Sequence, residues 1–254
     1  MTTRSMFRAL ALAALLLPSA PAASRAAEAA EPYKVRVNLA FFVGPQRYSM
    51  TDINEGIAAT NADFHSDPLL NAAGLELASI RSGFTYGVGI RVWPSRGTMI
   101  GFDYERLRGS SYASVPVSAT PGAPSFSAEV TSPAQVLALN LGRLYDWPSK
   151  AIRFGYSTGV SYYLCDGIAR VSFPGYAEFV RLHSTGGGLQ TFALADFALS
   201  STLQLEAAFG YRTANTKDLE TKGAGPLFQG VSWGRADHSG LITRIGLNIP
   251  FGPH

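Results

Sequence analysis

The sequence predicts an all-β fold, an eight-stranded antiparallel up-and-down transmembrane β-barrel. Three observations lead to this prediction. Apolar residues alternate with polar or small residues over eight segments of strand length. Short turns alternate with long connections between these segments. After residue 30, no segment has the roughly twenty successive apolar residues of a membrane-spanning helix. A closed barrel is the other arrangement that satisfies the backbone in lipid.

The N-terminus is interpreted as a cleaved signal peptide of about thirty residues. Arg4 and Arg8 give it a positive start, and an apolar stretch at 9–17 precedes a run of small residues. This stretch is about half the length that a spanning helix needs. We therefore expect a signal peptide at 1–30 and a single β-barrel domain at 31–254.

The charge balance does not favour a nucleic-acid partner. The chain has 21 basic and 18 acidic residues, and without the three residues Arg4, Arg8 and Arg25 the basic residues also number 18. Nucleic-acid binding usually requires a strongly basic surface, which a chain of balanced charge does not provide.

The first four predicted strands are 34–44, 82–93, 98–108 and 130–144. Each has the two-residue period of a strand whose two faces differ in polarity. The apolar faces carry, in order, Val37, Leu39 and Phe41; Tyr86, Val88 and Ile90; Ile100, Phe102 and Tyr104; and Leu137, Leu139 and Leu141. The opposite faces carry Arg36 and Asn38; Gly89 and Arg91; Asp103 and Glu105; and Ala138, Asn140 and Gly142.

The last four predicted strands are 152–164, 188–198, 203–212 and 241–251. The first of them has the clearest alternation and is long enough to cross a membrane at a tilt. In 188–198 both faces are fairly apolar, but Gln190 and Asp196 share one face. In 203–212, Leu205, Phe209 and Tyr211 lie opposite Glu206 and Arg212. In 241–251, Ile245, Leu247 and Ile249 lie opposite Arg244, Gly246 and Asn248.

The connections are sorted by length, which is a second and independent indication of a barrel. The tight turns are 94–97, 146–149 and 199–202, and the long connections are 45–80, 109–129, 165–187 and 213–239. In bacterial outer-membrane barrels the short turns and both termini face the periplasm, and the long loops are extracellular. We expect the same arrangement in this chain.

The first long connection is predicted to contain a short helix. Asp52 and Glu55 have the spacing of a capping box at a helix start. Ile53, Ile57 and Phe64 lie on one helical stripe.

The larger apolar residues are expected to face lipid and the small and charged residues to face the barrel interior. Aromatic residues near strand ends are expected to form two interfacial girdles. The residues proposed for the turn end are Tyr33, Trp93, Tyr145, Trp147 and Phe251, and those for the loop end are Tyr104, Tyr162 and Tyr211.

The interior face carries nearly balanced charges, which predicts a network of ion pairs in the lumen. Buried charges must be paired, since an uncompensated one costs several kcal/mol. Such a network either plugs and stiffens the barrel or lines a narrow solute path. Its predicted members are Arg36, Arg91, Asp103, Glu105, Arg153, Asp196, Glu206, Arg212 and Arg244.

The C-terminal run from Arg244 to Phe251 resembles the assembly signal of bacterial outer-membrane barrels, with Gly246, Ile249 and Phe251 at its key positions. With the signal peptide and the strand pattern, the chain resembles the small outer-membrane β-barrel superfamily of the outer membrane protein A and W kind. This resemblance implies an outer-membrane location, contact with outer-membrane lipid and insertion by the assembly machinery. It implies no reaction, and we expect a monomer.

No residues form a convincing catalytic, cofactor or metal site. His183 and Ser184 could serve a lipid-modifying hydrolase with Glu178, but adjacent strand residues point to opposite faces. His65, His183 and His238 lie in three connections without ligand spacing, so they are expected at the surface. Gly186, Gly187 and Gly188 lack the strand and helix of a phosphate-binding loop and are expected at a loop base.

The long connections are the remaining candidate surface for function. Their apolar residues either pack over the barrel mouth or line an opening for a hydrophobic ligand. These residues are Phe64, Leu69, Leu70, Phe173, Phe179, Leu227 and Phe228. The expected role is structural or loop-mediated interaction. A small porin or hydrophobic-solute channel is the second hypothesis, and an outer-membrane lipid-modifying enzyme the third.

Overall fold

The structure is a computed structural model that describes residues 34–118, 120, 122–146, 151–223, 228 and 231–251. The predicted signal peptide at 1–30 lies outside the described residues, as do Tyr33, Trp147 and Leu227.

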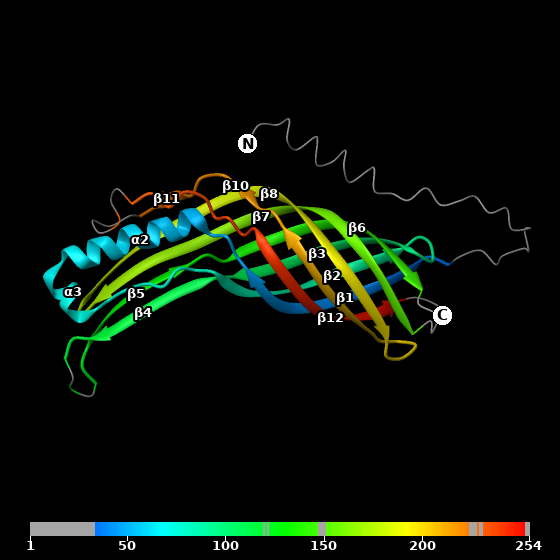
Figure 1. Cartoon of the computed structure of the whole chain (residues 1–254), viewed down its shortest axis with the longest axis horizontal. Coiled ribbons are helices and arrows are strands. Elements are labelled where there is room, and N and C mark those ends of the chain that lie inside the picture. The colour runs from blue at the N-terminus through cyan, green and yellow to red at the C-terminus, as the bar shows by residue number, and fades with distance from the viewer. Residues whose placement is uncertain are drawn as a thin grey trace, which may run out of the picture. The chain divides into compact units, whose positions relative to one another are not determined.

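Eight antiparallel strands form a closed ring (Figure 1). In chain order they are β1 (Arg36–Arg47), β2 (Ser82–Trp93), β3 (Thr98–Arg108), β6 (Ala134–Asp146), β7 (Ile152–Phe173), β8 (Tyr176–Ala198), β9 (Gln204–Arg212) and β12 (Gly240–Phe251). Each pairs with the next in this order, and pairing of β1 with β12 closes the ring. The predicted eight-stranded up-and-down barrel is confirmed.

The ring turns large apolar side chains outward and polar ones inward. Leu139 at the middle of β6 pairs with Phe102 of β3 and Val160 of β7, and all three are exposed. The next residue, Asn140, is buried inside the ring. Successive side chains along a strand point to opposite faces. The strand register therefore determines the polarity of both the outer and the inner surface of the ring.

Two connections predicted as loops are instead strands that extend the sheet beyond the ring. The predicted loop 165–187 continues β7 and β8 as one long hairpin. The predicted loop 109–129 contains β4 (Ser110–Pro116) and β5 (Ser125–Thr131), and β5 pairs with β7.

The predicted loop base at Gly186, Gly187 and Gly188 is also wrong, because these residues lie within β8. β10 (Asn215–Thr216) and β11 (Glu220–Lys222) pair with β8. A side chain at Gly186 would come within 2.4 Å of the backbone of Asn215 and Thr216. Glycine therefore permits the close approach of β10.

The predicted helix is present as α2 (Thr51–Ser66), followed by α3 (Pro68–Ala73). Ile53, Ile57 and Phe64 are buried, as their spacing predicts. The capping box is wrong, since the N-cap is Met50 and no side chain caps the helix. The Asp52 carboxylate instead accepts a hydrogen bond from the backbone N–H of Arg235 at 2.9 Å. Neither of these helices is long and apolar enough to cross a membrane.

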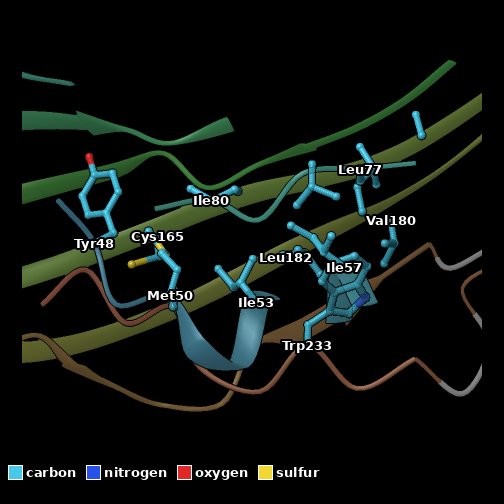
Figure 2. Close-up of a cluster of buried hydrophobic side chains, with 14 of the residues drawn as sticks. Tyr48, Met50, Ile53, Ile57, Leu77, Ile80, Cys165, Val180, Leu182 and Trp233 are labelled. Carbon is cyan, nitrogen blue, oxygen red and sulfur yellow. The ribbon is translucent and has the colours of Figure 1, made fainter. Parts of the chain in front are cut away.

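The helices and the extended sheet enclose an apolar core, here called the cap core (Figure 2). We call the described residues within 48–80, 110–131, 165–187 and 213–239 the cap. The cap core residues labelled in Figure 2 are Tyr48, Met50, Ile53, Ile57, Leu77, Ile80, Cys165, Val180, Leu182 and Trp233.

Most of the apolar residues noted in the long connections pack into the cap core. Phe64, Leu70 and Phe228 are buried there, and Phe173 packs against it. Leu69 and Phe179 are exposed. The packing alternative therefore describes most of this set, and two of its members remain at the surface.

Candidate functional site: the barrel interior

Four arginines and four carboxylates from different strands meet inside the ring. Their formal charges cancel, four positive against four negative. They are Arg91 on β2, Asp103 and Glu105 on β3, Arg153 on β7, Asp196 on β8, Glu206 and Arg212 on β9, and Arg244 on β12. We call this set the lumen network.

Glu105 is the centre of the loop-side half of the network. One of its oxygens accepts a hydrogen bond from Nη2 of Arg212 at 2.7 Å, and the other pairs with Arg244. Thr85 Oγ1 also donates to Glu105, at 3.3 Å. Charge-assisted contacts from two guanidinium groups compensate a carboxylate that has no exposed surface.

Asp103 and Glu206 connect Arg91 to the rest of the network. Asp103 forms an ion pair with Arg91 and lies 3.5 Å from Nη1 of Arg244. Nη2 of Arg91 lies 3.7 Å from Glu206. Arg91 therefore links β3 to β9 across the interior.

Arg153 and Asp196 form a pair nearer the turn end of the barrel. Nη2 of Arg153 donates to Asp196 at 2.8 Å and to Gln204 at 3.3 Å. The Arg153 guanidinium also lies 4.6 Å from the ring centre of Trp93, a cation–π geometry.

The prediction that Trp93 belongs to the turn-end girdle is wrong. It is only 1% exposed and faces the interior, where it stacks with Arg153. Trp93 shares strand parity with Arg91, so the alternation of β2 places both side chains inside. Of the other girdle residues that the structure describes, Tyr145, Tyr162, Tyr211 and Phe251 are exposed, and Tyr104 is partly exposed.

Arg36 differs from the other predicted members of the lumen network in its exposure. It has the inward parity of β1, but it is the first residue of that strand and is exposed. Inward parity therefore does not imply burial at a strand end.

Amide side chains complete the network and were not predicted as members. Asn140 donates to Asp103 at 2.9 Å, and Gln190 donates to Asn140 at 2.7 Å. Asn248 donates to Glu206 at 3.2 Å. All three have inward parity in the sequence pattern, which is the signal that could have identified them.

One small cavity lies within the lumen network. A cavity of about 10 Å³ lies among Arg91, Asp103, Glu206 and Arg244. This is about the volume that the centre of one water molecule needs. Phe42 and Phe192 further fill the interior, with ring centres 4.7 and 4.3 Å from the Arg244 guanidinium.

The residues considered for a hydrolase do not converge. Ser184 is buried and donates to the backbone oxygen of Lys217 at 2.6 Å. His183 lies on the opposite face of β8, with a half-exposed side chain whose Nδ1 is 2.7 Å from Asp166. The nucleophile and base geometry of that hypothesis is therefore not present.

The three histidines do not form a metal site, and one of them is not at the surface. His65 on α2 is exposed, but His238 has no exposed surface and contacts Tyr48 with ring centres 5.3 Å apart. Within the part of the chain that the structure describes, no three His, Cys, Asp or Glu residues are grouped as metal ligands.

The polarity of the sheet reverses along β7. In the ring, its outward residues Phe154, Val160 and Tyr162 are apolar or aromatic and exposed. Beyond Leu164 the outward side carries Asp166 and Arg170, and the inward side turns apolar with buried residues of the cap core. The ring thus has a lipid-facing pattern, and the cap has the pattern of a water-soluble protein.

The comparisons with known proteins give structural similarity at low sequence identity. No protein-family model and no curated protein matches the chain. Similar solved structures include Neisserial surface protein A (TM-score 0.40; 86% of this chain, 100% of that chain) and a major outer membrane protein from Thermus thermophilus (0.47; 85% and 99%). A third is the outer membrane protein OprG from Pseudomonas aeruginosa (0.43; 86% and 95%). Each is 12% identical to this chain. The fold assignment itself rests on the strand pairing described above.

Proposed function

We propose that this chain is an integral outer-membrane protein whose barrel is closed and anchors the cap, which has a structural or interaction role at the cell surface. The observation that carries this proposal is the lumen network, whose ion pairs join β2, β3, β9 and β12 and, separately, β7 and β8. A conducting pore requires a continuous aqueous path through this network.

Insertion into a membrane is supported by the outer surface of the ring. Between Gln135 and Arg143, the outward residues of β6 are Leu137, Leu139 and Leu141. On β12 the outward residues from Leu241 to Phe251 carry no charge. A membrane-spanning strand needs about nine to eleven residues at a tilt, which matches these segments.

The buried ion pairs favour a closed interior. Removing one partner leaves an uncompensated charge and costs about 3–5 kcal/mol. A widened lumen would have to separate several pairs together. The network therefore supports a rigid anchor over the porin hypothesis.

Two further parts of the proposal concern partners. Ile249 and Phe251 of the predicted assembly signal face outward, and Gly246 faces inward. This placement leaves the aromatic side chain accessible to the assembly machinery. The remaining proposed contact is outer-membrane lipid along the apolar ring, with the chain as a monomer.

Single-channel conductance in planar bilayers tests the closed barrel. The folded protein is inserted, insertion is verified by its heat-dependent electrophoretic mobility, and current is recorded. We expect no steady conductance steps from the unmodified protein. Arg91→Ala and Glu206→Ala each remove one side of a lumen pair, and Arg143→Ala removes an outward arginine as a control.

The outcomes separate anchor from pore. Silence of the unmodified protein and of Arg143→Ala supports the closed anchor, and steps that appear only in the lumen variants assign the closure to those side chains. Steady steps from the unmodified protein, altered by Arg91→Ala or Glu206→Ala, would establish a conduit and overturn the proposal.

A further inference from the structure

An apolar groove lies on the outward surface of β9, β12, β1, β2 and β3. Its volume is about 740 Å³, and the outward residues that line it include Phe41, Val88, Leu205, Ile245 and Leu247. Phe41 pairs with Val88 on one side and with Leu247 on the other, so the groove crosses neighbouring strands at one level of the barrel.

One end of the groove is marked by arginines. Arg106 lines the groove, and Arg108 follows two residues later on the same outward side of β3. Both are exposed, and neither forms an ion pair with any residue that the structure describes. The two acidic residues of β3, Asp103 and Glu105, face the interior.

Tyrosines surround these arginines at the boundary of the apolar belt. The Arg108 guanidinium lies 5.7 Å from the ring centre of Tyr86. Tyr86 and Tyr104 both line the groove, and Tyr86 pairs directly with Arg106. Tyrosine at this level is typical of the membrane interface, where lipid headgroups lie.

We propose that Arg106 and Arg108 bind the phosphate of a phosphorylated outer-leaflet lipid, whose acyl chain occupies the groove. The inference rests on the proposed outer-membrane location. Guanidinium groups bind phosphate through paired hydrogen bonds. The apolar lining matches an acyl chain, and a single ligand with both parts satisfies both ends of the groove.

Free phosphate fits only one end of this site. It would contact the arginines but leave the apolar groove unused. We therefore propose a lipid as the ligand. Inorganic phosphate is the comparison ligand, because it can bind the arginines but cannot fill the apolar groove.

Native mass spectrometry of the folded protein, purified from membranes in a non-ionic detergent, measures this binding. The probe is diphosphorylated lipid A, and phosphatidylcholine and inorganic phosphate are titrated separately. The test variant is Arg106→Ala/Arg108→Ala. Each arginine near an anionic lipid contributes a factor of about five, so we expect about 25-fold weaker lipid A binding.

Arg143→Ala is the matched control. Arg143 is also an outward arginine beside a tyrosine, with its guanidinium 5.4 Å from the ring centre of Tyr145, but it lies at the turn end of the barrel. We expect this variant to bind lipid A as the unmodified protein does. Val88→Trp fills the groove and is expected to weaken lipid A binding without removing an arginine.

The possible results are distinguishable. A protein that inserts in membranes but binds lipid A equally in the arginine variant and the control overturns this inference and leaves the proposed function intact. Displacement of lipid A by inorganic phosphate at comparable concentration also overturns the lipid assignment. Failure of the unmodified protein to insert overturns the proposed function and this inference together.

Discussion

His238 is a buried base where the cap meets the barrel interior. Its ring packs edge-on against Tyr48, and its Nε2 lies 3.5 Å from Ser132 Oγ. Burial, with a smaller contribution from the nearby positive charge of Arg212, lowers the pKa of His238 from 6.5 to about 3. The side chain therefore remains neutral in the folded cap over the usual pH range.

This pKa difference predicts loss of cap stability in acid. Below pH 6.5 an unfolded His238 binds a proton, but the folded one does so only near pH 3. The unfolded state therefore binds more protons between these values, and stability falls as the pH falls through this window. Above pH 6.5 both states are neutral and the effect is absent. At pH 4.5 the cost is about 3 kcal/mol.

Hydrogen exchange of residues 231–239 and of α2, corrected for intrinsic rates, measures this cost at pH 7 and 4.5. His238→Gln keeps a polar side chain but cannot bind this proton, so the pH dependence should shrink. His65→Gln, at an exposed site on α2, should leave it unchanged. Equal pH dependence in His238→Gln and the unmodified protein would contradict the role of His238.

The sequence predicts whether a single side chain faces the interior only where a clear strand alternation surrounds it. Arg91, Glu105 and Arg244 could be assigned to the interior because their neighbours alternate clearly. His238 could not, because it lies in a connection where no period indicates which side chains are buried. Its environment depends on Tyr48 and Ser132, which are distant in sequence.

At the scale of elements, α2 is held against the rest of the cap by a close contact at Gly56. A side chain at this position would come within 2.7 Å of Cε3 of Trp233, which is itself buried in the cap core. Glycine inside a helix normally costs about 1 kcal/mol relative to alanine. Here the absence of a side chain permits the packing of α2 on Trp233.

Gly56→Ala is therefore predicted to destabilise the cap although it favours the helix. Overpacking of a filled core costs about 1–3 kcal/mol, which outweighs the gain in helix propensity. We expect about fivefold faster hydrogen exchange in α2, which corresponds to a net cost of about 1 kcal/mol. Glu55→Ala, at an exposed neighbouring position, should show no such increase. Slower exchange in Gly56→Ala would indicate that Trp233 can move aside.

The ring strands were predictable as elements, and the cap hairpins were not, for one physical reason. In the ring, apolar residues are outward and form clear alternation with glycine, serine and charge. Beyond Leu164 the alternation continues with the opposite polarity, so Asp166, Arg170 and Arg181 give the segment the composition of a loop. Burial of Val180 and Leu182 becomes evident only when α2 covers them.

At the scale of the molecule, the sheet has two surface patterns, an apolar outward surface on the ring and an outward surface with charged residues on the cap. If the ring lies in a membrane, the same substitution should have a large effect at an exposed site on the ring and a small effect at an exposed site on the cap. Leu139 is 49% exposed at the middle of the ring, and Tyr112 on β4 of the cap is 65% exposed. If water surrounded both surfaces, arginine would be tolerated at both, because neither side chain is buried.

In a membrane, Leu139→Arg should instead cost about 2–4 kcal/mol, as expected for a lipid-facing arginine near the bilayer midplane. Tyr112→Arg should change stability by less than about 0.5 kcal/mol, as expected for a surface substitution. Denaturant titration of both variants folded into lipid vesicles measures these costs. A large loss confined to Leu139→Arg places the bilayer around the ring, since exposure to lipid is the property that separates the two sites. Equal, small effects would mean that water surrounds the ring, and the outer-membrane proposal would then fail.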